Sequence, residues 1–234
     1  MPMELSSEAL GLEAEADFSA VAEVIGAGDE LATKWVRDVG QQLRGVTQKA
    51  REATRRAAQL HQDDVSNPAG VQRMLAEIPG NLRAATDAQL KQAADTLTLI
   101  REVHTGGLLR RDPKDDPALQ FEVTNYVAAL TKETAPAALK ALCENPRYAS
   151  FMAGPAGLSL AARFEIRDAS IFERTALAAL GTEGVGSPEQ VARSRALAKI
   201  DAGQTALGKA RGARDFAAEE SQRPPARKPT AAMF

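Results

Sequence analysis

The fold is decided by residues 36–60, which read VRDVGQQLRGVTQKAREATRRAAQL. Apolar or small residues recur in this stretch at alternating steps of three and four, which is a strict heptad pattern over more than three repeats. Ala occupies the second half of the pattern, so that another helix can approach closely there. The pattern predicts a long helix with a continuous seam that consists of Val36, Val39, Leu43, Val46, Ala50, Ala53, Ala57 and Leu60.

A second segment with the same spacing follows after a short connection. Pro68 begins it, because proline is favoured at the first position of a helix. Two matching seams so close together favour an antiparallel helical hairpin over residues 29–107, and they make a coiled-coil dimer through residues 36–60 the weaker interpretation. The second seam consists of Val71, Leu75, Ile78 and Leu82.

Proline and glycine residues mark the expected interruptions of this hairpin. Pro79 lies inside the second seam and predicts a kink or a split, because it lacks an N–H and its ring clashes with the preceding turn. Gly106-Gly107 predicts the end of the helix. Asp29 is positioned to cap the first helix of the pair.

Outside the hairpin we expect four further parts. A short helix from Asp17 to Ile25 is expected in the N-terminal part. The complete division is an acidic arm at 1–28, the hairpin at 29–107, a second helical subdomain at 108–181, a hinge with a C-terminal helix at 182–221, and a basic proline-rich tail at 222–234.

The second subdomain contains one ambiguous segment. Leu119, Phe121 and Val123 alternate with polar residues, as in a strand. The same region also fits a helix, and Pro117 together with the later Ala-Ala-Leu favours the helix. Farther on, Pro155 is expected to begin one long helix that continues to about residue 180.

The C-terminal helix has a clear start and a poor apolar stripe. Ser187, Pro188 and Gln190 form the signature of a capping box with proline in the first turn. Leu207 and Phe216 are among the few large apolar residues that follow, so this helix is expected to pack on a neighbouring chain. The tail after it is expected to be disordered when it is alone in water.

Composition is consistent with an all-α protein. The chain has 234 residues, of which 44% are hydrophobic but only 4% aromatic, and alanine makes up much of the difference. Alanine has the highest helix propensity and permits close packing but builds a thin core. We therefore expect an elongated antiparallel helical bundle with extended polar termini.

Charge is distributed unevenly along the chain. The net charge of −2 argues against a protein that binds polyanions over its whole surface. Residues 1–33 carry acids and no Lys or Arg, whereas residues 34–56 are rich in bases. The acidic arm is expected either to fold back on the basic helix or to meet its own partner. The strongest basic cluster comprises Lys49, Arg51, Arg55 and Arg56.

Few sequence motifs suggest a catalytic or ligand-binding site, and each lacks a feature that such a site requires. Residues 203–209 (GQTALGK) have the spacing of a phosphate-binding loop, but Ala210 stands where a Ser or Thr is needed and no strand precedes the motif. His61 and His104 are expected at opposite ends of the hairpin as helix-terminal cations, so they should not share a metal. Cys143 is expected to be a buried, inert thiol. No catalytic residue, cofactor or metal is predicted.

Localisation signals are also lacking in the sequence. The N-terminal residues have neither the basic region nor the apolar core of a secretory signal, and no stretch reaches the roughly 18 apolar residues of a membrane span. A cytoplasmic protein or a component of a virion is expected.

These observations predict a non-enzymatic structural or assembly protein. It would be a homo-oligomer within a larger complex, most simply a virion, as a phage connector, head–tail or internal protein. The alternative is a helical adaptor, chaperone or secretion-associated protein of the bacterial cytoplasm, and nucleic-acid binding is not favoured. The residues expected to contact partners are Lys49, Arg51, Arg55, Arg56, Leu207, Phe216, Arg223, Arg227 and Lys228.

Overall fold

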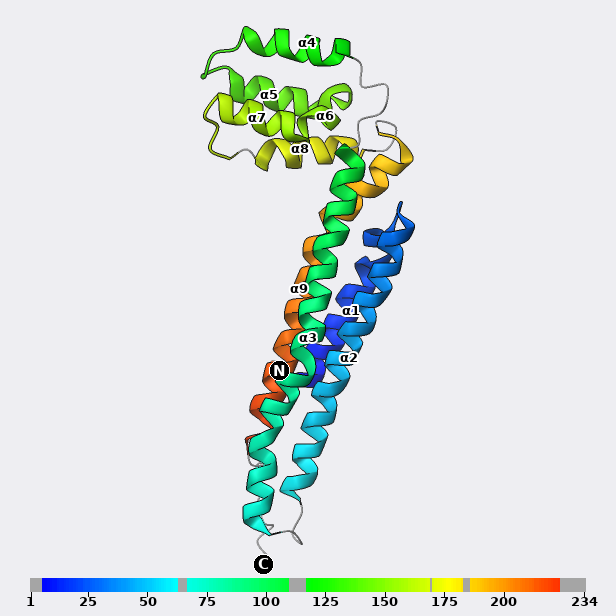
Figure 1. Ribbon diagram of the computed structural model, residues 1–234, viewed down its shortest axis with the longest axis vertical. Helices are drawn as coiled ribbons and strands as arrows, with labels where there is room; N and C mark the ends of the chain where they lie inside the picture. Colours follow the sequence, from blue (N-terminus) through cyan, green and yellow to red (C-terminus); the bar gives the residue numbers. More distant parts are fainter. Residues whose placement is uncertain (1–5, 63–66, 110–116, 169, 183–185, 224–234) are drawn as a thin grey trace, which may run out of the picture. The chain divides into compact units, whose positions relative to one another are not determined.

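The computed structural model describes residues 6–62, 67–109, 117–168, 170–182 and 186–223 (Figure 1). All regular secondary structure within these ranges is α-helical, which confirms the predicted fold class. The helices in the described ranges are α1 (Ser7–Gly26), α2 (Glu30–His61), α3 (Pro68–Leu109), α4 (Pro117–Ala128), α5 (Ala135–Glu144), α6 (Pro146–Met152), α7 (Pro155–Arg163), α8 (Ser170–Leu180) and α9 (Pro188–Glu220).

The chain divides into two compact units, and each combines segments that are distant in sequence. The first unit comprises Met1–Glu23, Lys34–Thr98 and Asp201–Phe234, and the second comprises Val24–Thr33 and Leu99–Ile200. Four long helices, α1, α2, α3 and α9, contribute a portion to each unit.

The first unit is a bundle of four helices in which neighbours run antiparallel (Figure 1). Its helices are joined in a ring by polar contacts. Helix α2 contacts α1 through Arg51 and Glu15 at 3.4 Å, and it contacts α3 through Lys49 and the carbonyl oxygen of Ala85 at 2.9 Å. Helix α9 contacts α3 through Arg214 and Asp87, and it contacts α1 through Lys209 and Glu13 at 3.0 Å.

The seams of α2 and α3 lie inside this bundle. The second half of the α2 seam packs on the first half of α3 in two small clusters, one around Ala57, Leu75 and Ile78 and the other around Ala50 and Leu82. Pairing of α2 with α3 therefore agrees with the predicted hairpin. Burial of these apolar side chains supplies most of the driving force for the packing.

Helix α9 packs within the chain, contrary to the expectation that it would need a neighbouring molecule. Its buried positions recur at alternating steps of four and three, but most of them carry small residues. A stripe counted from large apolar residues alone therefore underestimated how much of α9 is buried. The buried row consists of Ala196, Ile200, Gly203, Leu207, Ala210, Arg214, Ala217 and Ser221.

Helix α1 begins ten residues earlier than predicted. Ser6 caps it, because its side-chain oxygen accepts a hydrogen bond from the backbone N–H of Ala9 at 3.1 Å. Asp17, which was expected to be the cap, lies in the middle of the helix and pairs with Lys209 at 2.7 Å. Much of the predicted acidic arm is thus an ordered helix that packs on α2 and α9.

Helix α3 continues through Pro79, so the predicted split is not found. Because proline has no N–H, the carbonyl oxygen of Leu75 lacks its usual helical donor four residues later. The side-chain amide of Gln222, just after α9, donates to that oxygen at 2.7 Å. A contact from a distant segment thus replaces the missing hydrogen bond.

The second unit is built around α4 to α8. The buried side chains of these helices form one cluster, in which Leu139, Met152 and Phe172 are among the largest. The ambiguous segment at 119–124 is part of helix α4, as the proline before it favoured. Cys143 lies in this core, and burial raises the pKa of its thiol to about 12.

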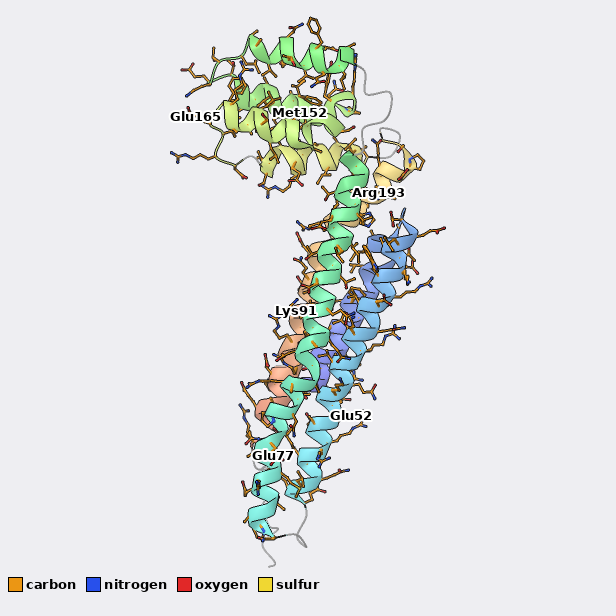
Figure 2. All side chains as sticks on the ribbon, in the orientation of Figure 1. Glu52, Glu77, Lys91, Met152, Glu165 and Arg193 are labelled. Carbon is orange, nitrogen blue, oxygen red and sulfur yellow. The ribbon has the colours of Figure 1, made fainter. Side chains whose placement is uncertain are left out.

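The predicted long helix from Pro155 to residue 180 is two helices, α7 and α8. Helix α7 ends in a Schellman arrangement, in which the N–H of Ile166 bonds to the carbonyl of Ala161 at 2.9 Å. Glu165 occupies the left-handed position at φ 56°, where glycine is the usual residue. Glu165, which is labelled in Figure 2, pairs through its exposed carboxylate with Lys132. The sequence carries no glycine to mark this turn, so the break was missed.

Gly106 and Gly107 also differ from expectation, because α3 continues past both of them to Leu109. A Cβ atom on Gly107 would lie 2.3 Å from the guanidinium carbon of Arg193, whereas one on Gly106 would meet nothing within 4 Å. Gly107 therefore provides the space in which Arg193 lies against α3.

Candidate protein-binding surfaces

The predicted basic cluster on α2 is only partly exposed. Lys49 reaches α3, where it also contacts the Gln89 side chain at 3.1 Å, and Arg51 pairs with Glu15 of α1. Arg55 and Arg56 are exposed. Two of the four cations thus hold the first unit together, and two remain on its surface.

The predicted contact residues near the C-terminus differ in their exposure. Leu207 is 6% exposed and belongs to the buried row of α9, so it is not a surface residue of the chain. Phe216 is half-buried, and Arg223 is exposed and pairs with Glu219 at 3.7 Å. Arg227 and Lys228 lie outside the described residues.

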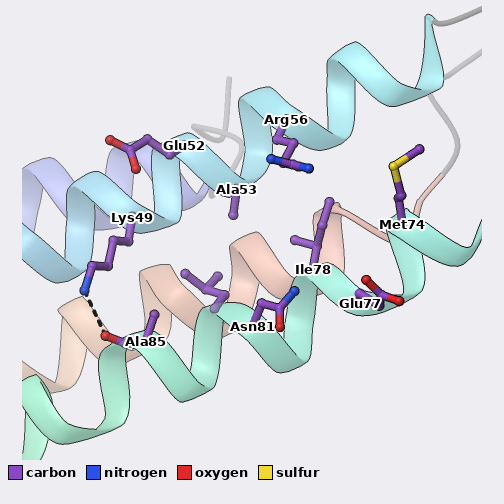
Figure 3. Close-up of a pocket in the computed structure, with 10 residues that line it drawn as sticks. Lys49, Glu52, Ala53, Arg56, Met74, Glu77, Ile78, Asn81 and Ala85 are labelled. Atoms are coloured by element: carbon purple, nitrogen blue, oxygen red, sulfur yellow. Dashed lines mark hydrogen bonds between the residues drawn. The ribbon is translucent and has the colours of Figure 1, made fainter. Parts of the chain in front are cut away.

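A groove of about 390 Å³ runs between α2 and α3 in the first unit (Figure 3). Ala53, Ile78 and Leu82 supply apolar lining, and the small size of Ala53 leaves space that a larger seam residue would fill. The rim carries both signs of charge, from Lys49, Glu52, Arg56 and Glu77. Met74 adds a flexible apolar side chain at one end.

A larger groove of about 570 Å³ lies between α1 and α2, also within the first unit. Phe18, Val36 and Leu43 supply its apolar lining. Arg37 and Arg44 border it on the α2 side, together with Gln41. On the α1 side Glu15 and Ser19 also line it. A groove with an apolar floor and one cationic wall is a surface on which an amphipathic helix with acidic residues can bind.

The outward face of α2 continues this cationic wall and was not recognised from the sequence. Its residues recur at heptad steps, alternately one and two positions beyond a seam residue, and they comprise Lys34, Arg37, Gln41, Arg44, Gln48, Arg51 and Arg55. We call this set the basic stripe. Except for Arg51, none of its cations has a carboxylate partner among the residues that the structure describes. Counting charges in the register of the apolar seam would have revealed it.

Helix α4 exposes aromatic side chains in the second unit. Phe121 is 68% exposed and Tyr126 48% exposed, while Val123 and Val127 of the same helix are buried. Glu122 anchors α4 to α6, because it accepts hydrogen bonds from the Tyr148 hydroxyl at 2.6 Å and from Arg147. The hydrogen bond to Glu122 raises the pKa of Tyr148.

A polar cluster around the buried Arg193 joins the α1–α2 turn to α3 and α9 in the second unit. Arg193, which is labelled in Figure 2, donates to Glu189 at 2.9 Å, to Asp29 at 3.4 Å and to the carbonyl oxygen of Val103 at 3.3 Å. The backbone N–H of Ala32 and the charge of Arg193 lower the pKa of Asp29. The cluster holds these segments together.

His104 belongs to the same cluster and corrects the expectation of a helix-terminal cation. Its side chain is fully buried, and Nε2 lies 2.5 Å from the carbonyl oxygen of Ile25. Burial, above all, lowers the pKa of His104, so the ring is neutral and donates this hydrogen bond.

The motifs that were rejected from the sequence lie inside helices. Gly203 to Lys209 is part of the continuous helix α9, so its amides point along the helix and cannot surround a phosphate. Within the described residues no group of three or more His, Cys, Asp or Glu side chains is arranged to hold a metal ion. No helix in the same ranges is both long and apolar enough to cross a bilayer.

Comparison with known proteins adds no relative, since no family model, no curated protein and no solved structure matches this chain.

Proposed function

We propose that this protein is a non-catalytic helical assembly protein, which binds other protein subunits through the outer faces of its first unit. The observation that supports this proposal is the α1–α2 groove with the adjoining basic stripe. Apolar lining beside a row of cations, of which only Arg51 has a carboxylate partner among the described residues, is the combination that protein-binding helical surfaces use.

The setting that we favour is a large repeated complex such as a virion, in which the chain is a connector, head–tail or internal protein. Support for it comes from the alanine-rich helices, the long heptad seams and the polar terminal segments of the sequence. Helices with small residues pack closely and leave their charged outer faces for contacts between subunits.

A second candidate function is that of a helical adaptor or chaperone in the bacterial cytoplasm. The groove between α2 and α3 favours it, because an apolar floor with a rim of both charges can take a single helix of a partner (Figure 3).

Native mass spectrometry and light scattering on the untagged full chain separate these candidates. An assembly protein is expected to form a defined oligomer, alone or with the subunits that co-purify with it from its source. A monomer that binds one partner chain in a one-to-one complex would instead support the adaptor. A strictly monomeric chain that shifts DNA in a salt-dependent manner would contradict both proposals.

A further inference from the structure

The outer face of α1 carries a second exposed stripe beside the α1–α2 groove. It consists of Glu8, Leu12, Ala16, Ala20 and Glu23, which are all exposed and follow one another at steps of four or three residues. Leu12 is 54% exposed. Neither Glu8 nor Glu23 has a cationic partner among the described side chains. We call this set the acidic-ended stripe, since its acids flank an apolar centre.

The two stripes lie at matching levels of the bundle. Ser7 contacts Thr54 near one end of α1, and the ring of Phe18 lies over Gly40 farther along it. This antiparallel register sets Glu23 level with the turn of α2 that carries Arg37. It sets Ala16 level with Arg44.

Glu8 is level, in the same register, with the turn of α2 that carries Arg51 and Arg55. The acids of α1 thus match the levels of the cations of α2. Within one chain, however, the two stripes face outward side by side and not toward each other.

Resting on the proposed assembly function, we infer that the partner of this face is a second copy of the same chain. The copies are related by a two-fold axis that runs parallel to α1 and α2 along the groove between them. Such an axis sets α1 of each copy on α2 of the other and keeps every residue at its own level.

Charge and size complementarity both follow from that arrangement. Glu23 of one copy faces Arg37 of the second copy, and Glu8 faces the turn with Arg51 and Arg55. At the centre the small side chain of Ala16 leaves room for the long side chain of Arg44 of the second copy, whose stem covers apolar surface. Each contact occurs twice because the interface is symmetric.

A charge-swap series tests this pairing. Glu23→Arg and Arg37→Glu, each alone, should raise the dimer dissociation constant at least about tenfold, because each sets like charges against each other at two symmetric sites. The double variant should restore it to within about threefold, since the opposite charges again face each other. The measurement is sedimentation equilibrium of the full chain in low salt, with circular dichroism to show that both exposed sites leave the fold unchanged.

A steric variant with a matched control completes the test. Ala16→Arg should abolish the dimer, whereas Ala88→Arg, at an exposed alanine of α3 away from this face, should leave it intact. An oligomer that tolerates Ala16→Arg, or a charge swap without rescue, overturns the inference and leaves the proposed assembly function standing.

A wild-type chain that stays monomeric at high micromolar concentration also overturns this inference. The proposed function is then decided separately by the mass of its complexes with other subunits. DNA binding by that monomer that Arg37→Glu abolishes would assign the basic stripe to nucleic acid instead.

Discussion

At the scale of single residues, neighbouring positions of identical type have opposite roles because of what lies beside them. Gly106 and Gly107 are adjacent in α3, yet only Gly107 is in contact with another segment, the guanidinium group of Arg193. The same guanidinium donates to the Val103 carbonyl oxygen. The glycine is thus required by packing and not by the backbone conformation.

Substituting the two glycines by alanine should therefore have opposite effects. Gly107→Ala should destabilise the protein by about 1–3 kcal/mol, because the added methyl group displaces the buried arginine. Gly106→Ala should stabilise it by up to about 1 kcal/mol, since alanine is the better helix former. Urea denaturation followed by circular dichroism measures both, and equal effects of the two substitutions would contradict this account.

His104 should make stability depend on pH. Its pKa is lowered in the folded protein from the ordinary 6.5, so the unfolded chain binds a proton that the folded chain excludes. The stability that the neutral His104 ring contributes is fully present above pH 6.5. It is lost as the pH falls from there toward the lowered pKa of the folded protein. Arg193 and Asp29 are the charged groups that act on the ring, and the lowered pKa of Asp29 adds a separate loss only below 3.8.

The measurement is the melting temperature of the wild type and of His104→Gln between pH 7.5 and 5. The variant should be less stable at pH 7.5 but should lose less on acidification. Parallel curves for the two proteins would show that another group is responsible for the pH dependence.

At the scale of helices, continuity and termination depend on partners that are far away in sequence. Helix α3 passes through Pro79 with the help of Gln222, and α7 ends at Glu165 without a glycine. In both places the local sequence correctly indicates an unfavourable backbone arrangement. A hydrogen bond from Gln222 compensates for it at Pro79, whereas the Schellman turn at Glu165 retains the strain of a positive φ.

A double-mutant cycle tests the role of Gln222. Gln222→Ala should cost about 1 kcal/mol in the wild type, since it leaves the Leu75 carbonyl oxygen without a donor. In the background of Pro79→Ala the backbone N–H of the substituted residue supplies the bond, and Gln222→Ala should then cost close to nothing. Chemical denaturation of the four proteins yields the coupling energy, and a value near zero would refute the interpretation.

The turn after α7 should tolerate glycine better than any other residue. Glu165→Gly should stabilise the protein by about 1 kcal/mol, because glycine adopts a positive φ without strain. Glu165→Ala loses the same exposed pair with Lys132 but retains the strain, so it isolates the backbone effect. Similar stabilities for these two variants would exclude strain at this position.

At the scale of the whole molecule, the chain has two compact units with different cores. The first unit is closed by small residues along α2 and α9, and the second by larger side chains around Met152 and Phe172. Cys143 lies only in the second core, so its thiol reports on the opening of that unit.

Thiol reactivity should distinguish damage to the two cores. Gly157→Ala would set a Cβ atom 2.0 Å from the Met152 carbonyl oxygen, and it should raise the rate at which a disulfide reagent labels Cys143. Ala210→Leu overpacks the first unit and should raise that rate far less at an equal loss of overall stability. Equal labelling rates would mean that the two units open together.

Several features of the fold could be predicted from the sequence because they depend on local periodicity. The seams of α2 and α3, the reciprocal cap of Ser187 and Gln190 and the buried thiol of Cys143 belong to this group. The α9 row and the basic stripe have equally regular spacing. The α9 row was missed because only large apolar residues were counted in that helix, and the basic stripe because charged residues were not counted in the heptad register.

By itself the sequence determined that the chain is helical and where its longest apolar seams lie, because heptad spacing and alanine content act through neighbours one turn apart. Only the tertiary structure decided which charges remain exposed and which helix covers which seam. It also decided that Pro79 is tolerated and that Gly107 is not a helix end. These outcomes depend on Gln222 and Arg193, and no local pattern records which distant side chain will arrive.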